Sequence, residues 1–341
     1  MKAELKPRIN LEERTKLETV IPIETPYVLF VDPSSACNFR CTFCPTGDRQ
    51  LIRETGRWQG AMDFDLFRKI IDDLKEFESP IKVLRLYKDG EPLMNKRLPE
   101  MIRYAKESGR VDAVDTTTNG SLLTPERSLK LVDAGLDRIN ISVDGLSDSD
   151  FEIFTQTKTK FADLVANVRF FYENKKGCEV CVKMPGDLLS AEQKEFFFST
   201  FGDICDRISL ENIAPCWPEF GVEERMNIEI TTGIYNNPIS EVSVCPYIFY
   251  SFSINSDGSV SLCFLDWARK LPVGDVRKQS LREIWQSQEL YDYRRSHLVG
   301  DRKKYEVCGS CGQLSHCLPD NIDVHAIVLL EKITAARTTP R

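Results

Sequence analysis

The sequence predicts an α/β protein: a partial (βα)6 TIM-like barrel followed by a small C-terminal domain built from a β-hairpin and a helix. Two observations lead to this prediction. Short β-rich apolar runs alternate with amphipathic runs over the first two thirds of the chain, which implies parallel strands joined by right-handed crossovers. Beyond about residue 215 the alternation stops, and a hairpin pattern takes its place. The 341 residues are enough for one full domain and an appendage.

The barrel is expected from six strands and the helices between them. The run 64–74 carries apolar residues at three- and four-residue steps, which is one face of a helix. Six units rather than eight leave an open side for a large substrate, and the active site is expected at the C-terminal ends of the strands. The strands are predicted near 27–32, 82–88, 111–117, 138–144, 178–184 and 207–213, and further helices near 98–108, 124–134, 161–175 and 190–204.

The C-terminal third has its own signals. Residues 252–263 alternate on both sides of Asp257-Gly258, which is a strong hairpin pattern. Ser280 and Glu283 form a capping box at the start of a helix. A last helix is expected near 324–333, where it covers the barrel or makes a dimer contact. The predicted division is an N-terminal extension (1–26), the barrel (27–215), a second domain (216–320) and a C-terminal helix and tail (321–341).

The composition of the chain excludes some classes of binding partner. The net charge is −7 without any Lys/Arg-rich block, which argues against nucleic acid. No apolar run reaches about 18 residues, so we expect no membrane partner, and the first residues lack the apolar core of a signal peptide. Twelve cysteines in such a chain indicate metal ligands rather than disulfides, which predicts a cytoplasmic protein.

The most informative motif is the spacing C-x3-C-x2-C, formed by Cys37, Cys41 and Cys44 directly after the first predicted strand. Three thiolates so close together can bind three irons of a [4Fe–4S] cluster and leave the fourth iron open for a substrate or cosubstrate. Zinc is the alternative, but zinc takes four ligands. Unrelated buried thiols are a second alternative.

This motif resembles that of the radical S-adenosylmethionine (SAM) superfamily, and three downstream segments resemble it too. Gly90-Glu91-Pro92 is similar to the family's GGEP turn, although Asp89 replaces the first glycine. Residues 116–120 are similar to the TTNG segment, and residues 138–145 to the strand that ends in SxDG. The resemblance implies that the open iron chelates SAM. It assigns cofactor contacts to Phe43, Gly90, Glu91, Pro92, Thr117, Asn119 and Ser142, and Lys183 is a further candidate for the SAM carboxylate.

A second group of four cysteines could bind all four irons of another cluster, one thiolate to each iron, or could bind zinc instead. The order of residues around them resembles the SPASM/Twitch extension of radical SAM enzymes. A full SPASM domain has seven cysteines, but Asn321 stands where one would follow Cys317. The resemblance therefore favours one auxiliary cluster, a [4Fe–4S] cluster in the Twitch form of aminocyclitol dehydrogenases, held by Cys245, Cys263, Cys308 and Cys311.

The resemblance implies that SAM is cleaved to a 5′-deoxyadenosyl radical, with an electron donor such as flavodoxin or ferredoxin. The radical would take hydrogen from a small polar substrate, such as a sugar, an aminocyclitol or a polyol. The outcome is oxidation of an alcohol or epimerisation. Cys216 and Cys317 are candidate hydrogen donors, passive buried thiols being the alternative, and Glu211 is a candidate base.

Other functions are considered against this one. A SPASM enzyme that modifies peptides often has an N-terminal leader-binding module, and about 26 residues before the first strand are too few for it. The molybdopterin-pathway cyclase ends in Gly-Gly, whereas this chain ends in Thr-Thr-Pro-Arg. A non-catalytic iron–sulfur scaffold would not need the SAM-facing segments.

Overall fold

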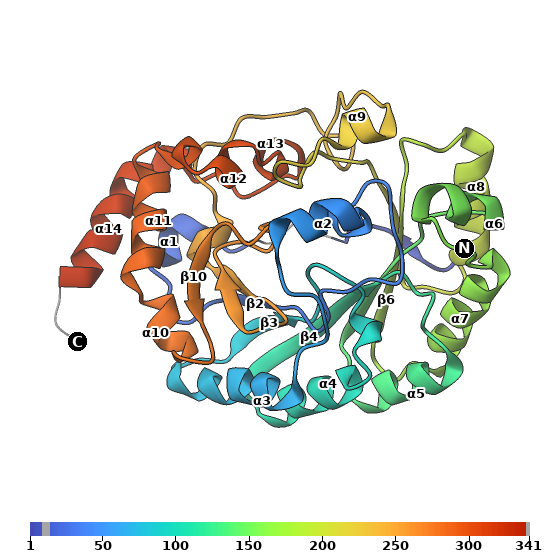
Figure 1. The fold of residues 1–341 in the computed structure, drawn as a ribbon, viewed down its shortest axis with the longest axis horizontal. Coiled ribbons are helices and arrows are strands. Elements are labelled where there is room, and N and C mark those ends of the chain that lie inside the picture. The colour runs from blue at the N-terminus through green and yellow to red at the C-terminus, as the bar shows by residue number, and fades with distance from the viewer. Residues whose placement is uncertain (9–13, 339–341) are drawn as a thin grey trace.

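The computed structural model describes residues 1–8 and 14–338. Its centre is a sheet with the strand order β1-β7-β6-β5-β4-β3-β2-β8-β9-β10, in which β2 to β7 are parallel neighbours (Figure 1). These six strands confirm the predicted partial barrel. They are β2 (Val28–Val31), β3 (Ile81–Arg85), β4 (Val111–Thr118), β5 (Arg138–Ser142), β6 (Glu179–Pro185) and β7 (Arg207–Glu211).

The five predicted helices follow the strands and cover the outer face of the sheet (Figure 1). Side chains at the N-terminal ends of three of these helices explain where the helices begin. The Asp63 side chain accepts from two backbone N–H groups, Thr124 accepts from one, and Ser190 forms a capping box. The helices are α3 (Phe64–Asp73), α4 (Leu98–Glu107), α5 (Pro125–Asp133), α7 (Phe161–Asn174) and α8 (Ala191–Phe201).

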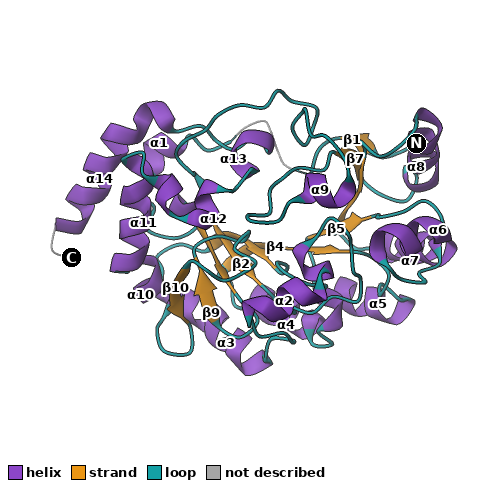
Figure 2. Cartoon of the chain, turned by 45° about the horizontal axis from the view of Figure 1, so that its top comes forward, coloured by secondary structure: helices purple, strands orange, loops and turns teal. Residues whose placement is uncertain are grey.

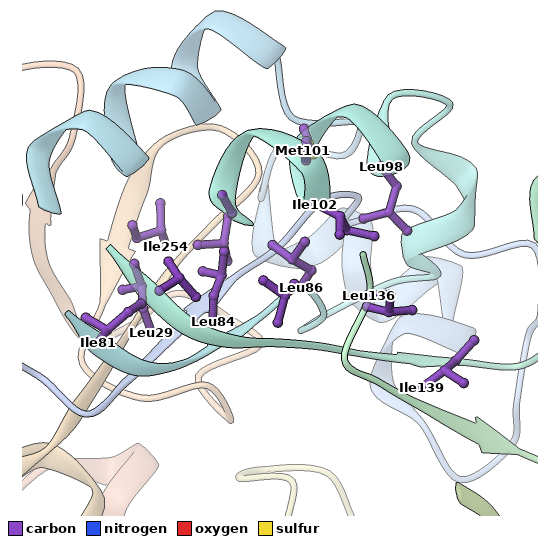
Figure 3. Close-up of a cluster of buried hydrophobic side chains, with 14 of the residues drawn as sticks. Leu29, Ile81, Leu84, Leu86, Leu98, Met101, Ile102, Leu136, Ile139 and Ile254 are labelled. Atoms are coloured by element: carbon purple, nitrogen blue, oxygen red, sulfur yellow. The ribbon is translucent and has the colours of Figure 1, made fainter. Parts of the chain in front are cut away.

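The core lies between the strands and these helices. Figure 3 shows side chains of α4, including Leu98, Met101 and Ile102, beside Leu84 and Ile139 of the sheet, and all five are fully buried. Because side chains alternate along a strand, the neighbouring positions face the barrel interior. Such interior positions include Phe30, Arg85, Thr117, Asn140 and Lys183.

Both edges of the barrel sheet are extended. β1 (Glu4–Leu5) pairs in parallel with β7, an edge strand that the sequence did not predict. At the other edge, β8 (Ser251–Ile254) pairs in parallel with β2. The predicted hairpin is β8 with β9 (Ser259–Ser261), and β10 (Pro272–Asp275) adds a third strand. The C-terminal hairpin therefore continues the barrel sheet.

The remaining helices lie mostly around the C-terminal part. The capping box of Ser280 and Glu283 is confirmed at the start of α10 (Leu281–Trp285). The predicted last helix is α14 (Ala326–Thr338), which lies beside α11 (Gln288–Leu298) at one end of the molecule (Figures 1 and 2). The shorter helices are α1 (Leu17–Val20), α2 (Arg49–Thr55), α6 (Asp148–Asp150), α9 (Val222–Met226), α12 (Glu306–Gly309) and α13 (Gln313–His316).

The N-terminal segment is described in two parts, 1–8 and 14–20, which lie at opposite ends of the molecule (Figures 1 and 2). It starts beside α8, where the backbone N–H groups of Lys2 and Ala3 donate to Gly202. It reaches α1 near α14, where Lys332 donates to the carbonyl of Glu18 (Figures 1 and 2). None of the helices in the described part of the chain has the length and apolar character needed to span a membrane.

Candidate active site

One cavity of about 770 Å³ occupies the barrel interior and the C-terminal ends of its strands. It is also lined by residues of the C-terminal region and of the N-terminal segment. Pro92 is buried in the short 3₁₀ turn Pro92–Met94 and does not line the cavity. The other predicted residues that line it are Cys37, Cys41, Phe43, Cys44, Gly90, Glu91, Thr117, Asn119, Ser142, Lys183, Glu211, Cys216 and Cys317.

The three-cysteine loop follows β2 and is fixed by backbone hydrogen bonds. The N–H groups of Arg40 and Thr42 each donate over 2.9 Å to carbonyls of the short π-helix Phe151–Thr155 that follows α6. Burial raises the pKa of Cys37 to about 12 and raises the pKa values of Cys41 and Cys44 as well. Free thiols here stay protonated, whereas a bound metal would deprotonate them. Three free cysteines at one wall of a cavity therefore fit an iron–sulfur cluster with an open iron.

Gly90 brings the turn after β3 against this loop. A β-carbon at this position would lie 2.2 Å from the carbonyl oxygen of Ala36 and 2.4 Å from that of Ser34. The next residue, Glu91, donates its backbone N–H to Ala36 over 2.9 Å. The glycine is thus required for close approach of two backbones.

The Glu91 carboxylate holds the turn to the end of β4. It accepts from the backbone N–H groups of Leu93 and Asn119 and from the Thr118 hydroxyl, at 2.7–2.9 Å. Burial raises the pKa of Glu91 to about 7, although these bonds favour the carboxylate. Glu91 therefore positions the backbone around the predicted SAM contact Asn119.

Asp89, which departs from the family's glycine, is the centre of a buried ion network. Its carboxylate lies 2.9 Å from Lys88, 3.1 Å from Arg57 and 3.9 Å from Arg269. Arg57 also donates to the carbonyl of Trp267 over 2.8 Å. The network joins the turn after β3 to the C-terminal region, so the aspartate has a structural use that a glycine lacks.

At the ends of β6 and β7, Lys183 and Glu211 form an ion pair at 2.6 Å. Tyr235 donates to the other Glu211 oxygen over 2.7 Å, and Arg8 lies 3.6 Å from the same oxygen. Burial opposes ionisation, but Lys183 and Arg8 lower the pKa of Glu211 to about 2. A carboxylate held in this way is a weak base, so the geometry favours a positioning role for Glu211.

The second group of cysteines surrounds a separate, small cavity of about 30 Å³ with a mostly apolar wall. Within the described residues, no three His, Cys, Asp or Glu side chains converge on a point that could hold one metal ion. Tetrahedral zinc needs four sulfurs at about 2.3 Å from one point, whereas a larger cluster suits ligands spread around a cavity. The cysteines are Cys245, Cys263, Cys308 and Cys311.

Cys216 and Cys317 lie on the side of the large cavity that faces the second group. The Sγ atom of Cys311 is 3.9 Å from the backbone oxygen of Cys216. Cys317 lines the large cavity and does not line the small one.

Sequence reasoning missed several residues of the large cavity. Arg8 and Arg14 come from the N-terminal segment, where no local pattern indicates a site. Phe264, Tyr247 and Tyr250 come from the C-terminal region and also line the cavity. Only their aromatic character was visible in the sequence.

The comparisons with known families agree with this arrangement. Residues 31–192 match the radical SAM superfamily, and residues 245–312 match an iron–sulfur cluster-binding domain, SPASM. The chain is therefore a radical SAM enzyme with a SPASM domain. The predicted cofactors are confirmed at this level: a radical SAM domain carries a [4Fe–4S] cluster and uses SAM, and a SPASM domain implies auxiliary iron–sulfur clusters.

Among named relatives, the chain is 24% identical to the AdoMet-dependent heme synthase of Methanosarcina barkeri, over 84% of this chain and 88% of that protein. It is 37% identical to the GTP 3′,8-cyclase of Chlorobaculum tepidum, over 36% of this chain and 34% of the cyclase. The second match spans about a third of either protein.

Solved structures share the fold. BtrN in complex with AdoMet and 2-DOIA superposes with a TM-score of 0.56 and 19% identity, over 87% of this chain and 97% of BtrN. Streptococcus suis SuiB bound to precursor peptide SuiA superposes with a TM-score of 0.60 and 16% identity, over 88% of this chain and 72% of SuiB. The fold of BtrN agrees with the predicted resemblance to the Twitch form.

Proposed function

We propose that this enzyme cleaves SAM reductively and takes a hydrogen atom from a small polar substrate, such as a sugar, aminocyclitol or polyol, held in the 770 Å³ cavity. The reaction would oxidise an alcohol or invert a carbon centre. One observation carries the proposal: a single cavity is lined by the three-cysteine loop, by the predicted SAM contacts and by two further thiols beside the second cysteine group.

The ligand assignment follows from the two cysteine groups. Cys37, Cys41 and Cys44 would hold the cluster with the open iron, which suits their place on the cavity wall. Cys245, Cys263, Cys308 and Cys311 would hold one auxiliary cluster, and Cys317 would remain a free thiol because it does not line the small cavity.

When bound, the cluster and SAM supply a 5′-deoxyadenosyl radical, and the auxiliary cluster supplies an acceptor for an electron left on an oxidised substrate. The protein holds the reactants and excludes water. Gly90 lets the turn after β3 approach the cysteine loop, and Glu91 fixes the backbone at Asn119. Glu211 keeps Lys183 in place near Ser142 and Asp144.

The thiols of Cys216 and Cys317 bear on whether the reaction gives epimerisation or oxidation. A thiol on the cavity wall can return a hydrogen atom to the opposite face of a substrate radical, which gives epimerisation. Without that transfer, loss of a proton and an electron gives the ketone. Replacement of each cysteine by alanine separates the outcomes, because epimerisation requires the thiol and oxidation does not.

A low-potential reductant such as flavodoxin or ferredoxin would supply the electron, and the cytoplasm is the setting that we propose. All twelve cysteines lie in the described part of the chain and are free thiols, which suits a reducing compartment. Modification of a peptide is the alternative. The charged residues inside the barrel, such as Arg85 and Lys183, favour a small polar molecule.

The test is SAM cleavage by the anaerobically reconstituted enzyme with dithionite, measured as 5′-deoxyadenosine and methionine. Cys37→Ala should abolish 5′-deoxyadenosine formation, because only two of the three thiolates that bind the cluster remain. Cys178→Ala is the matched control, since Cys178 is a buried cysteine outside both cavities. Cleavage that persists in Cys37→Ala would reject the cluster assignment.

A further inference from the structure

Two arginines from distant parts of the chain meet inside the large cavity. Arg85 is the last residue of β3, and Arg8 follows β1 in the N-terminal segment. Each donates an Nη1–H to the hydroxyl oxygen of Tyr87, over 2.8 Å and 3.3 Å respectively. The Nε atom of each arginine is buried and has no hydrogen-bond partner. Both guanidinium groups line the cavity and are only partly satisfied by the protein.

The carboxylates nearest to this pair of arginines are not in direct hydrogen-bond contact with them. The nearest carboxylate oxygen of Asp115 is 3.8 Å from Arg85, and that of Glu211 is 3.6 Å from Arg8. Glu211 is already paired with Lys183 at 2.6 Å. Within the described residues, Arg8 and Arg85 therefore have no carboxylate at hydrogen-bond distance. Charged groups that are largely removed from water need a close partner, so one further anion would be stabilised here.

Other polar atoms nearby also lack partners. The Asp115 Oδ1, Thr117 Oγ1 and Asn140 Oδ1 atoms are buried without a hydrogen bond, and all three residues line the cavity. Buried polar atoms in proteins are nearly always bonded. A bound molecule that carries hydroxyl or amine hydrogens would satisfy them.

An aromatic wall adjoins the arginines. The Phe30 ring stacks on Phe264 with centroids 4.5 Å apart and meets Tyr87 edge-on at 5.8 Å. Tyr247 meets Phe264 edge-on at 5.7 Å. All four rings line the cavity. Such a wall suits the face of a ring or another flat body.

We propose that the substrate is a ring compound with an anionic arm, a carboxylate or a phosphate, and that Arg8 and Arg85 bind this arm beside Tyr87. The planar guanidinium groups offer paired donors that match either anion. The inference rests on the proposed function of the same cavity and narrows its substrate class. It also gives the N-terminal segment a role in substrate selection, because Arg8 belongs to that segment.

The test is calorimetric titration of the reconstituted holoenzyme with two probes, inorganic phosphate and succinate. One probe should bind to the wild type, and its Kd should rise by at least about tenfold in both Arg8→Gln and Arg85→Gln, because charged hydrogen bonds are lost. Tighter binding of phosphate indicates a phosphate ester, and tighter binding of succinate indicates a carboxylate. Arg103→Gln is the control, since Arg103 is an exposed residue of α4 outside the cavity.

The iron content and the melting temperature identify variants that keep the fold. If either folded variant binds the probe as the wild type does, or if the wild type binds neither probe at millimolar concentration, the proposal is rejected. Probe binding needs no radical chemistry. Failure of SAM cleavage in the wild type with intact probe binding would therefore reject the proposed function alone.

Discussion

Gly90 lies where two backbones come closest, and the cause is the approach of the turn after β3 to the cysteine loop. The carbonyl oxygens of Ser34 and Ala36 occupy the space where a β-carbon would project. Both obstacles are backbone atoms, which cannot rotate away as a side chain could. The sequence indicated Gly90 through its motif, but the contact that requires glycine is visible only in the fold.

Gly90→Ala should displace the cysteine loop and lower both the iron bound at the first site and the rate of SAM cleavage. Iron analysis and the yield of 5′-deoxyadenosine measure the two effects. Gly109→Ala is the control: Gly109 has a φ of +63° and no atom near its missing side chain, so this change should cost about 1 kcal/mol of stability and leave the iron unchanged. Full iron content in Gly90→Ala would contradict the explanation.

At the scale of elements, buried charges join the barrel to the C-terminal region. Asp89 contacts Lys88, Arg57 and Arg269. The side chains of Asp89, Lys88 and Arg57 are at most 1% exposed. Removing one member of such a group leaves the others buried without compensation. The sequence marked Asp89 only as a departure from the family's turn, because its partners are up to 180 positions away.

Asp89→Asn should lower the free energy of unfolding by about 3–5 kcal/mol, as expected for a broken buried ion pair. Urea denaturation under anaerobic conditions measures the change. Asp65→Asn is the matched control, because Asp65 pairs with Arg68 on the surface and is 85% exposed, so a loss below about 1 kcal/mol is expected. Equal losses in the two variants would show that the buried network adds no stability.

The strands also differ in whether a local sequence pattern or pairing with a distant strand explains their formation. The six barrel strands and the hairpin were predicted because each has its own apolar pattern. β1 and β10 were missed, since β1 has two exposed residues and β10 contains a glycine. Their strand form depends on pairing with β7 and β9.

The whole molecule combines two cysteine sites on one continuous sheet. β8 pairs with β2 and continues the barrel sheet. Of the second cysteine group, Cys263 follows β9 and Cys308 belongs to α12. Cys311 and Cys216 bring the two cavities together at one wall. This arrangement supports one radical cluster and one auxiliary cluster in the same chain.

Anaerobic reconstitution should therefore give about eight irons per chain, as two cubane clusters require. Alanine in place of Cys37, Cys41 and Cys44 should leave about four irons, and alanine in place of Cys245, Cys263, Cys308 and Cys311 should also leave about four. Iron and sulfide analysis measures both. A wild type with about four irons, falling to none in the first variant, would remove the auxiliary cluster and turn the search toward non-oxidative radical chemistry.

From the sequence alone we predicted the partial barrel, the three-cysteine loop and the SAM-facing segments, because each is formed by residues that are close together in the chain. The second cysteine group, spread over residues 245–311, was predicted from its resemblance to the SPASM/Twitch extension. Which distant residues share the cavity became visible only in the folded chain. The fold places Arg8 beside Arg85, ties Glu211 to Lys183, and puts Cys317 at the large cavity. Charge balance, ionisation and burial are set by neighbours in space, so no local pattern could have shown them.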